Sequence, residues 1–184
     1  MGTDTLVKEF KGRKDHVDYI KRGIAVENNF IKEARKRDYN IWIASEEQNI
    51  REHIDLVLQK DGKTFSVDIK ARRTGNKSRT FDDTWIVVEF LNTMGNKGWL
   101  YGKADYIVFE REKDFVFCET KDLVNLAHTF VDQKTRVDSY RDAEYKVWGR
   151  SYQGKKDLIS RMEMSKILDL KNTFIWKKSV DISN

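Results

Sequence analysis

Two acidic residues and a lysine on neighbouring segments are the residues of this sequence best placed to do chemistry. Asp55 lies in the segment HIDLVLQ (53–59), and Asp68 and Lys70 lie in TFSVDIKA (64–71). Both segments alternate aliphatic and polar residues, which is the period of a β-strand. The Asp-Gly pair between them is the strongest short signal for a hairpin turn. We therefore predict a hairpin with one buried aliphatic face and with Asp55, Asp68 and Lys70 on the opposite face.

The types of these three residues indicate a metal and phosphate site. Carboxylate oxygens are hard ligands of the kind that Mg²⁺ prefers, and an ammonium group can neutralise the charge of a phosphate. The alternative interpretation is that the three residues form the solvated side of an antiparallel sheet.

An acidic residue two positions before a lysine is a weak signal by itself, because the pattern recurs along the chain. It begins at Glu9, Asp61, Asp68, Glu119, Asp132, Glu144 and Asp169. A first carboxylate on the preceding strand adds information, and two places have one: Asp55 before Asp68 and Lys70, and Asp105 before Glu119 and Lys121. We favour the first place, because Glu119 and Lys121 alternate onto the same face as aromatic residues.

A helix upstream of the hairpin supplies a third acid. The segment 15–37 has aliphatic residues at helical spacing, namely Val17, Ile20, Ile24, Ile31 and Ala34. Glu27 falls in a gap of this stripe, where a carboxylate is costly unless a cation meets it. Either Glu27 takes part in the site, or it lies just beside the stripe and pairs with a lysine or arginine.

Further charged residues follow the hairpin. Glu89 lies on the polar face of the strand predicted at 84–91, and is either a fourth acid of the site or an ordinary exposed glutamate. The stretch from Ile69 to Phe81 has no acid and reads as a flexible basic loop that is either solvated or meets phosphates. The basic residues expected to hold a DNA backbone are Arg72, Arg73, Lys77, Arg79, Arg150, Lys155 and Lys156.

The elements that must position these residues are predicted from the same patterns. We expect strands at 41–45, 84–91, 104–110, 115–119, 144–150 and 173–178, helices at 120–131 and 155–169, and a polar loop at 132–143. The loop at 92–102 either stacks a base on Trp99 or Tyr101, or packs these rings on the core. The order of elements predicts an α/β (α+β) fold.

The chain length suits a single domain of residues 1–184. Within it we expect a loose arm at 1–14, a core at 15–131, and a C-terminal helix and strand at 144–178.

Composition narrows the class of protein. The formal net charge of +5 favours a polyanionic partner. No run of ~20 apolar residues suits a membrane span, so we expect a cytoplasmic protein that does not bind membranes. The single cysteine, Cys118, excludes an internal disulfide and a cysteine-based zinc site. His16, His53 and His128 lack the spacing of zinc ligands.

Glu27 on a helix, HID (53–55) and SVDIKA (66–71) together resemble the PD-(D/E)XK nuclease superfamily, which includes restriction enzymes, junction resolvases and phage endonucleases. The resemblance covers roughly residues 20–73, and Ile54 stands where the family usually has a proline. It implies a restriction-endonuclease-like mixed central β-sheet flanked by helices.

The resemblance also implies roles for these residues. Asp55, Asp68 and the Ile69 carbonyl would bind Mg²⁺ or Mn²⁺, with Glu27, and Glu89 as a further candidate, completing the ligand set. Lys70 would orient or help to deprotonate the attacking water, or neutralise charge on the phosphorus.

The resulting hypothesis is a magnesium-dependent endonuclease, bacterial or phage-like, that hydrolyses DNA phosphodiester bonds. A homodimer would cut both strands most easily. Two alternatives stay open: a catalytically silent DNA-binding module of the same fold, and a protein-interaction domain that uses the Trp99 and Tyr101 loop.

Overall fold

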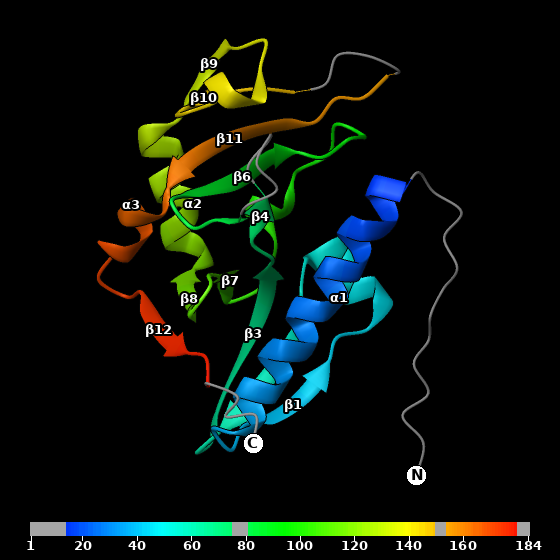
Figure 1. Ribbon diagram of the computed structural model, residues 1–184, viewed down its shortest axis with the longest axis vertical. Helices are drawn as coiled ribbons and strands as arrows, with labels where there is room; N and C mark the ends of the chain where they lie inside the picture. Colours follow the sequence, from blue (N-terminus) through cyan, green and yellow to red (C-terminus); the bar gives the residue numbers. More distant parts are fainter. Residues whose placement is uncertain (1–13, 75–80, 150–153, 180–184) are drawn as a thin grey trace.

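The centre of the fold is a six-stranded mixed β-sheet. In this computed structural model, residues 14–74, 81–149 and 154–179 are described. The strand order in the sheet is β1-β2-β3-β7-β8-β12. Figure 1 shows this sheet with α1 on one side and the β6–β11 ribbon beyond one end of β3. The sheet strands are β1 (Asn40–Ile43), β2 (Leu56–Lys60), β3 (Lys63–Lys70), β7 (Tyr106–Glu110), β8 (Asp114–Glu119) and β12 (Phe174–Lys177).

The predicted hairpin is confirmed. Strands β2 and β3 pair antiparallel with Leu56 opposite Val67, and Asp61 and Gly62 form the turn with positive φ angles. Strand β3 then pairs with β7 in parallel, whereas the other neighbours in the sheet are antiparallel. A parallel pair needs a long connection. Here that connection carries β4 (Arg73–Thr74), β5 (Phe81–Asp82), β6 (Trp85–Leu91) and the 3-10 turn η2 (Trp99–Tyr101).

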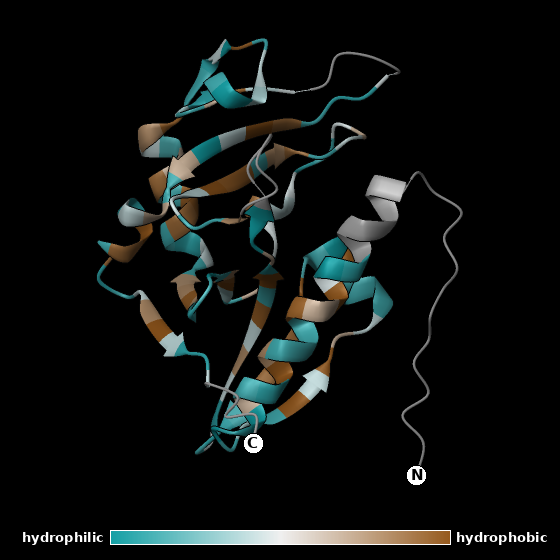
Figure 2. Cartoon of the chain, in the orientation of Figure 1, coloured by the Kyte–Doolittle hydropathy of each residue, from teal (hydrophilic) through white to brown (hydrophobic). Residues whose placement is uncertain are grey.

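Helix α1 (Lys14–Arg35) covers one face of the sheet. Its buried apolar side chains are Val26, Phe30 and Ala34, at the i, i+4, i+8 spacing of one helix face. The stripe predicted from the sequence is therefore displaced, because Ile24 is 51% exposed. The side chains of Val17 and Ile20 lie outside the described part of the chain. In Figure 2 the exposed face of α1 is hydrophilic.

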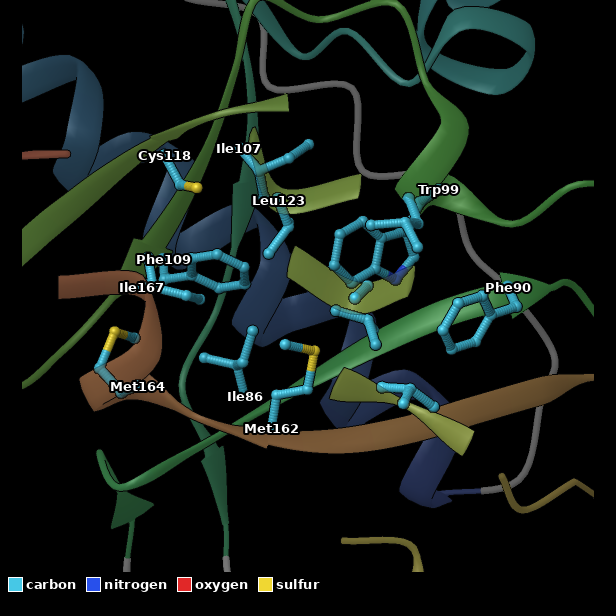
Figure 3. Close-up of a cluster of buried hydrophobic side chains, with 14 of the residues drawn as sticks. Ile86, Phe90, Trp99, Ile107, Phe109, Cys118, Leu123, Met162, Met164 and Ile167 are labelled. Carbon is cyan, nitrogen blue, oxygen red and sulfur yellow. The ribbon is translucent and has the colours of Figure 1, made fainter. Parts of the chain in front are cut away.

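The other face of the sheet carries a second core. Residues of β7 and β8 alternate between the two cores, with Ile107 and Phe109 in the second and Val108 in the first. The second core is closed by helix α2 (Thr120–Phe130), η2 and the antiparallel pair of β6 with β11 (Leu158–Glu163). Figure 3 shows its side chains, including Leu123 of α2.

The helix predicted at 155–169 is wrong. Its first half is strand β11, and only α3 (Met164–Leu168) is helical. Leu158, Ile159 and Met162 fit a helical stripe, but pairing with β6 buries them together with Ser160, which is fully buried. Tertiary pairing therefore overrides the local period.

The remaining elements agree with the predictions apart from one. The polar segment 132–143, predicted as a loop, contains the exposed strand β9, which pairs with β10 in parallel. The smaller elements are η1 (Gln48–Glu52), β9 (Asp132–Arg136), η3 (Tyr140–Asp142) and β10 (Lys146–Val147). The predicted mixed α/β fold with a central sheet flanked by helices is confirmed. None of the described helices is long and apolar enough to cross a membrane.

Candidate active site

Asp55 lies at the entrance to β2, where its side chain is held by two hydrogen bonds. Its Oδ2 accepts from the backbone N–H of Ile69 at 2.6 Å, and its Oδ1 accepts from Asn49 Nδ2 at 2.6 Å. The backbone N–H of Asp55 donates to Val67 O, so the hairpin ladder continues to this residue. Asp55 is therefore locked beside β3 by both its backbone and its carboxylate.

Asp68 is buried in the middle of the sheet, with 3% of its surface exposed. Its Oδ1 pairs with Lys70 Nζ at 2.7 Å, and its Oδ2 is buried without a hydrogen-bond partner in the described structure. The alternative interpretation, in which Asp68 lies on the solvated side of an antiparallel sheet, is wrong, because β3 is a central strand and the second core covers that face. A buried carboxylate oxygen without a partner is costly.

The charge of Asp68 disfavours ionisation of Asp55. Burial, and then the charge of Asp68, raise the pKa of Asp55 to about 6. Burial likewise raises the pKa of Asp68, although the ammonium of Lys70 opposes this. The two carboxyl groups are close enough to share a proton. A cation between them would relieve the repulsion that a proton otherwise relieves.

Glu27 approaches the pair from α1. Its side chain is half-buried, and burial, followed by the charge of Asp55, raises its pKa to about 7. The Lys70 ammonium acts in the opposite direction. Glu27 thus lies within electrostatic range of Asp55 and Lys70, which agrees with the interpretation that it belongs to the site.

Lys70 is fixed from two sides. Besides its ion pair with Asp68, its Nζ lies 4.5 Å from the ring centroid of Trp99. Trp99 is buried, and Figure 3 shows its indole pointing into the second core. Of the two interpretations of the 92–102 loop, the structure supports packing on the core for Trp99.

Glycine at position 98 is required for this packing. A Cβ at Gly98 would lie 2.2 Å from the carbonyl oxygen of Glu89, a contact with backbone that cannot be accommodated without movement. Gly98 N–H also donates to Phe90 O at 2.9 Å. The close approach of this loop to β6 therefore places Trp99 under Lys70.

Replacing Gly98 by alanine is expected to lower the free energy of unfolding by about 1–3 kcal/mol, the usual cost of overpacking. Urea unfolding measures the change. Gly23→Ala is the matched control, because a Cβ there meets no atom within 4 Å and alanine favours a helix. Equal stability of the two variants would contradict the proposed close packing at Gly98.

Glu89 lies beside Lys70 and is held by the loop. Its Oε2 accepts from the backbone N–H of Trp99 at 3.2 Å, and burial raises its pKa. The charges of Lys70 and Arg73 oppose that rise. Glu89 is therefore part of the charge network around Lys70, and its carboxylate is hydrogen-bonded to the loop.

The basic residues predicted to contact DNA are only partly described. Arg72 is engaged within the protein, with its Nε 2.6 Å from Asp83 Oδ1 and its guanidinium 4.8 Å from the Phe81 ring centroid. Arg73 is exposed at the end of the hairpin. Lys155 and Lys156 precede β11 on the turn beside Thr93, to which Lys156 N–H donates. Lys77, Arg79 and Arg150 lie outside the described residues.

The alternative site predicted from the sequence, Asp105 with Glu119 and Lys121, has a different arrangement. Asp105 Oδ2 accepts hydrogen bonds from Ser66 N at 2.7 Å and Ser66 Oγ at 2.8 Å. Glu119 pairs with Lys121 at 2.7 Å, and the Lys121 side chain is 73% exposed. These carboxylates have protein donors and line a wide, open hollow of about 700 Å³. They show no equivalent of the unpartnered oxygen of Asp68, so we retain the hairpin as the candidate site.

The donor set suits a magnesium ion. Across residues 14–74, 81–149 and 154–179, no three acidic, histidine or cysteine side chains are grouped as metal ligands. Magnesium, however, is commonly bound through one or two carboxylates together with waters and phosphate oxygens. Asp55 and the unpartnered Asp68 Oδ2 supply two such ligands. The Ile69 N–H points to Asp55, and the carbonyl of a strand residue points to the same side as its N–H, so this oxygen faces the same edge.

The raised carboxyl pKa values predict how stability depends on pH. In EDTA, the midpoint of thermal unfolding is expected to fall as the pH rises from about 4 to about 7. In this range the folded protein keeps protons on Asp55 and Glu27 that the unfolded chain has released. The lowered pKa of His53 opposes the trend, and so do the lowered pKa values of Glu33 and Asp114 at the acidic end of the range. The raised pKa values of Asp68 and Glu89 reinforce it.

Saturating Mg²⁺ should reduce this fall, because a bound cation replaces the protons. Thermal unfolding followed by circular dichroism, with EDTA or with Mg²⁺ at each pH, measures both trends. A midpoint in EDTA that rises across the same range would contradict the arrangement of these acids.

One residue of the site escaped sequence reasoning. Asn49 lies in the segment 46–52, which reads only as a polar link, yet its amide positions Asp55. Asn49 belongs to η1, a short helical turn that ends at His53 in a left-handed backbone conformation. The six-residue separation of Asn49 and Asp55 in sequence follows no period of regular structure, so no pattern pointed to the pair.

The fold and site together define a mixed α/β protein with a buried aspartate, a half-buried aspartate and an adjacent lysine. No protein-family model matches the chain, and no curated protein matches it. Among solved structures, a bacterial homing endonuclease, I-Ssp6803I, is similar with 16% sequence identity and a TM-score of 0.43. The match covers 62% of this chain and 74% of that chain. A likeness this remote does not assign residues or activity to this protein.

Proposed function

We propose that the protein is a metal-dependent deoxyribonuclease that hydrolyses phosphodiester bonds at Asp55, Asp68 and Lys70. The observation that carries the proposal is the buried Asp68 Oδ2, which lacks a hydrogen-bond partner and lies beside a second carboxylate of raised pKa. A buried carboxylate oxygen without a partner lowers the stability of the fold. A divalent cation bound to both carboxylates would compensate this cost.

A divalent cation bound here would polarise a phosphate and lower the pKa of a coordinated water. Asp55 and Asp68 would hold it, with the Ile69 carbonyl as a further oxygen ligand. Asn49 and the Ile69 N–H keep the Asp55 carboxylate oriented for this role.

Lys70 would neutralise charge on the phosphate or orient the attacking water. Its pairing with Asp68 and its packing on Trp99 fix the ammonium next to the acid pair. Glu27 has a pKa of about 7, so near neutral pH it can accept a proton from the attacking water. Hydrolysis would join the water oxygen to phosphorus and break the bond to the leaving oxygen.

DNA as the substrate follows from the charge of the surroundings. The chain is basic, with a formal net charge of +5. Arg73, which is exposed, lies three residues after Lys70 in the sequence. Cations next to the acid pair would hold the flanking phosphates. Magnesium as the natural metal and a homodimer as the cutting unit remain parts of the proposal.

Incubation with supercoiled plasmid, and with branched and single-stranded DNA, tests the function. We expect cleavage in Mg²⁺ or Mn²⁺ that EDTA prevents. Calorimetric titration with Mn²⁺ tests metal binding independently of the substrate. Absence of cleavage of every DNA tested, together with absence of Mn²⁺ binding, would contradict the proposal.

A further inference from the structure

A cavity of about 430 Å³ is lined by Lys70 and not by Asp55 or Asp68. Ligand pockets usually measure roughly 300–1,000 Å³, so this space suits a small ring system. Its lining comes from the end of β3, the start of β6, the Arg22–Gly23 part of α1 and the loop after β10. The cavity itself has no role in the function proposed above, although Ile69, Lys70 and Arg73 belong both to its lining and to the proposed site.

One part of the lining is aromatic. Trp85, Trp99, Tyr140 and Trp148 all line the cavity, so three of the five tryptophans of the chain gather there. Tyr140 and Trp148 contact each other edge to face, with their ring centroids 6.0 Å apart. The side chains of Trp85 and Trp148 are half-buried. Aromatic rings that remain partly accessible in a basic setting provide stacking surfaces for nucleobases.

These rings are supported from outside the cavity. The Arg161 guanidinium lies 4.6 Å from the Trp85 ring centroid and 5.5 Å from that of Tyr140, and Arg161 is not among the lining residues. It is held by hydrogen bonds to Arg141 O and Glu144 Oε1. Trp85 and Tyr140 are therefore pre-positioned by a cation that leaves the cavity itself open.

The charges inside the cavity favour an uncharged ring over a phosphate. Arg72 pairs with Asp83, and Arg111 pairs with Asp114, so two of the lining cations are already compensated. Among the lining carboxylates, Glu110 is likewise compensated by its ion pair with Lys178. Asp82, whose Oδ1 accepts from Thr84 N–H, adds a carboxylate that would repel a phosphate but can accept hydrogen bonds from base N–H groups. Lys70, and Arg73 at the exposed end of the hairpin, are the cations placed to meet a phosphate.

We propose that the cavity receives one unpaired nucleobase of the DNA, next to the phosphate that is cleaved. The inference rests on the proposed nuclease function and specifies its substrate: DNA with an extrahelical or unstacked nucleotide. The base stacks against the half-buried rings of Trp85 and Trp148, and the adjoining phosphate lies at Lys70, Asp55 and Asp68. A fully paired duplex has no base to offer, because its bases are stacked inside the helix.

Binding measured in EDTA tests this without any catalysis. The probes are a DNA duplex with one extrahelical 2-aminopurine, the same duplex with an abasic site at that position, and the fully paired duplex. We expect the base-containing bulge to bind about ten-fold more tightly than the abasic one, with a change in 2-aminopurine fluorescence on binding.

Two variants test the cavity from different directions. Trp148→Ala removes a stacking surface, and Ala71→Phe narrows the cavity from the end of β3 without removing a ring. Both should abolish the ten-fold preference. Trp42→Ala is the matched control, because Trp42 is a half-exposed tryptophan of β1 that does not line the cavity, and it should keep the preference.

Equal affinity of the wild-type protein for the bulged and abasic duplexes would overturn the inference, as would retention of the preference in folded Ala71→Phe. Plasmid cleavage separates the two proposals. Metal-dependent cleavage without a preference for the bulge would leave the nuclease and remove the base pocket. A preference for the bulge without cleavage under any metal would leave the pocket and remove the nuclease.

Discussion

Asp68→Asn is expected to abolish metal-dependent DNA cleavage while making the metal-free protein more stable. The substitution removes the charge that would hold the cation. Losing several kcal/mol of transition-state stabilisation should lower the cleavage rate on the order of 10³-fold. It also removes the charge of Asp68, which raises the pKa of Asp55 and so opposes ionisation of the neighbouring carboxyl group. An asparagine amide can donate to Asp55, so we expect a gain of about 1–2 kcal/mol in the free energy of unfolding.

Asp114→Asn is the matched control. Asp114 is as deeply buried as Asp68, but Arg111 and Lys177 bind both of its oxygens and hold its pKa below the usual range. Its substitution should cost about 1–3 kcal/mol of stability and leave cleavage per folded molecule unchanged. Urea unfolding and plasmid cleavage measure both properties. If Asp68→Asn destabilised the protein as Asp114→Asn does, Asp68 would be a structural residue.

Lys70→Met is expected to lower the cleavage rate by about 10²–10⁴-fold, the usual contribution of a positioned acid–base or charge-neutralising group. Methionine keeps the apolar packing on Trp99 but loses the ammonium that pairs with Asp68. The aspartates then lose a competing cation, so the affinity for Mn²⁺ should be retained or increased. The rate under saturating metal, together with the calorimetric affinity for Mn²⁺, separates a defect in the reaction from a defect in metal binding.

Lys60→Met provides the comparison. Lys60 also packs over an aromatic ring, with its Nζ 5.7 Å from the Tyr39 centroid, and it donates to Arg37 O. It has no carboxylate partner among the ion pairs of the described residues, and it lies at the opposite end of the hairpin. Its substitution should leave the cleavage rate within about two-fold. An equal loss of rate in both variants would show that the loss at Lys70 has no connection with the acid pair.

The local part of the site could be predicted from the sequence. Alternation of side chains and an Asp-Gly turn specify the β2–β3 hairpin, and the hairpin alone brings Asp55 next to the strand that carries Asp68 and Lys70. These signals depend on neighbours in sequence, which is why the hairpin, the β7–β8 pair and α2 were all predicted.

The surroundings of the site could not be predicted in the same way. The burial of Asp68 depends on β7 and on Trp99, which contact β3 from far along the chain: β7 pairs with residues 39 positions earlier, and Trp99 packs on Lys70, 29 positions earlier. Strand β11 could not be predicted for the same reason, because it is a strand only through its pairing with β6. The displaced stripe of α1 shows a related effect: Phe30 is selected for burial by Phe115 and Trp176, and their positions are set by the sheet.

The long connection between the parallel strands β3 and β7 has a consequence for the order of folding. The β2–β3 hairpin is local and can form early, whereas β7 and Trp99 dock only after the whole connection has closed. Water therefore shields the charges of the two aspartates from each other until the final docking step. Their repulsion then raises the free energy of that step. Refolding should accordingly be slowed at that late step by ionisation of the aspartates, and accelerated when a divalent cation is present from the start.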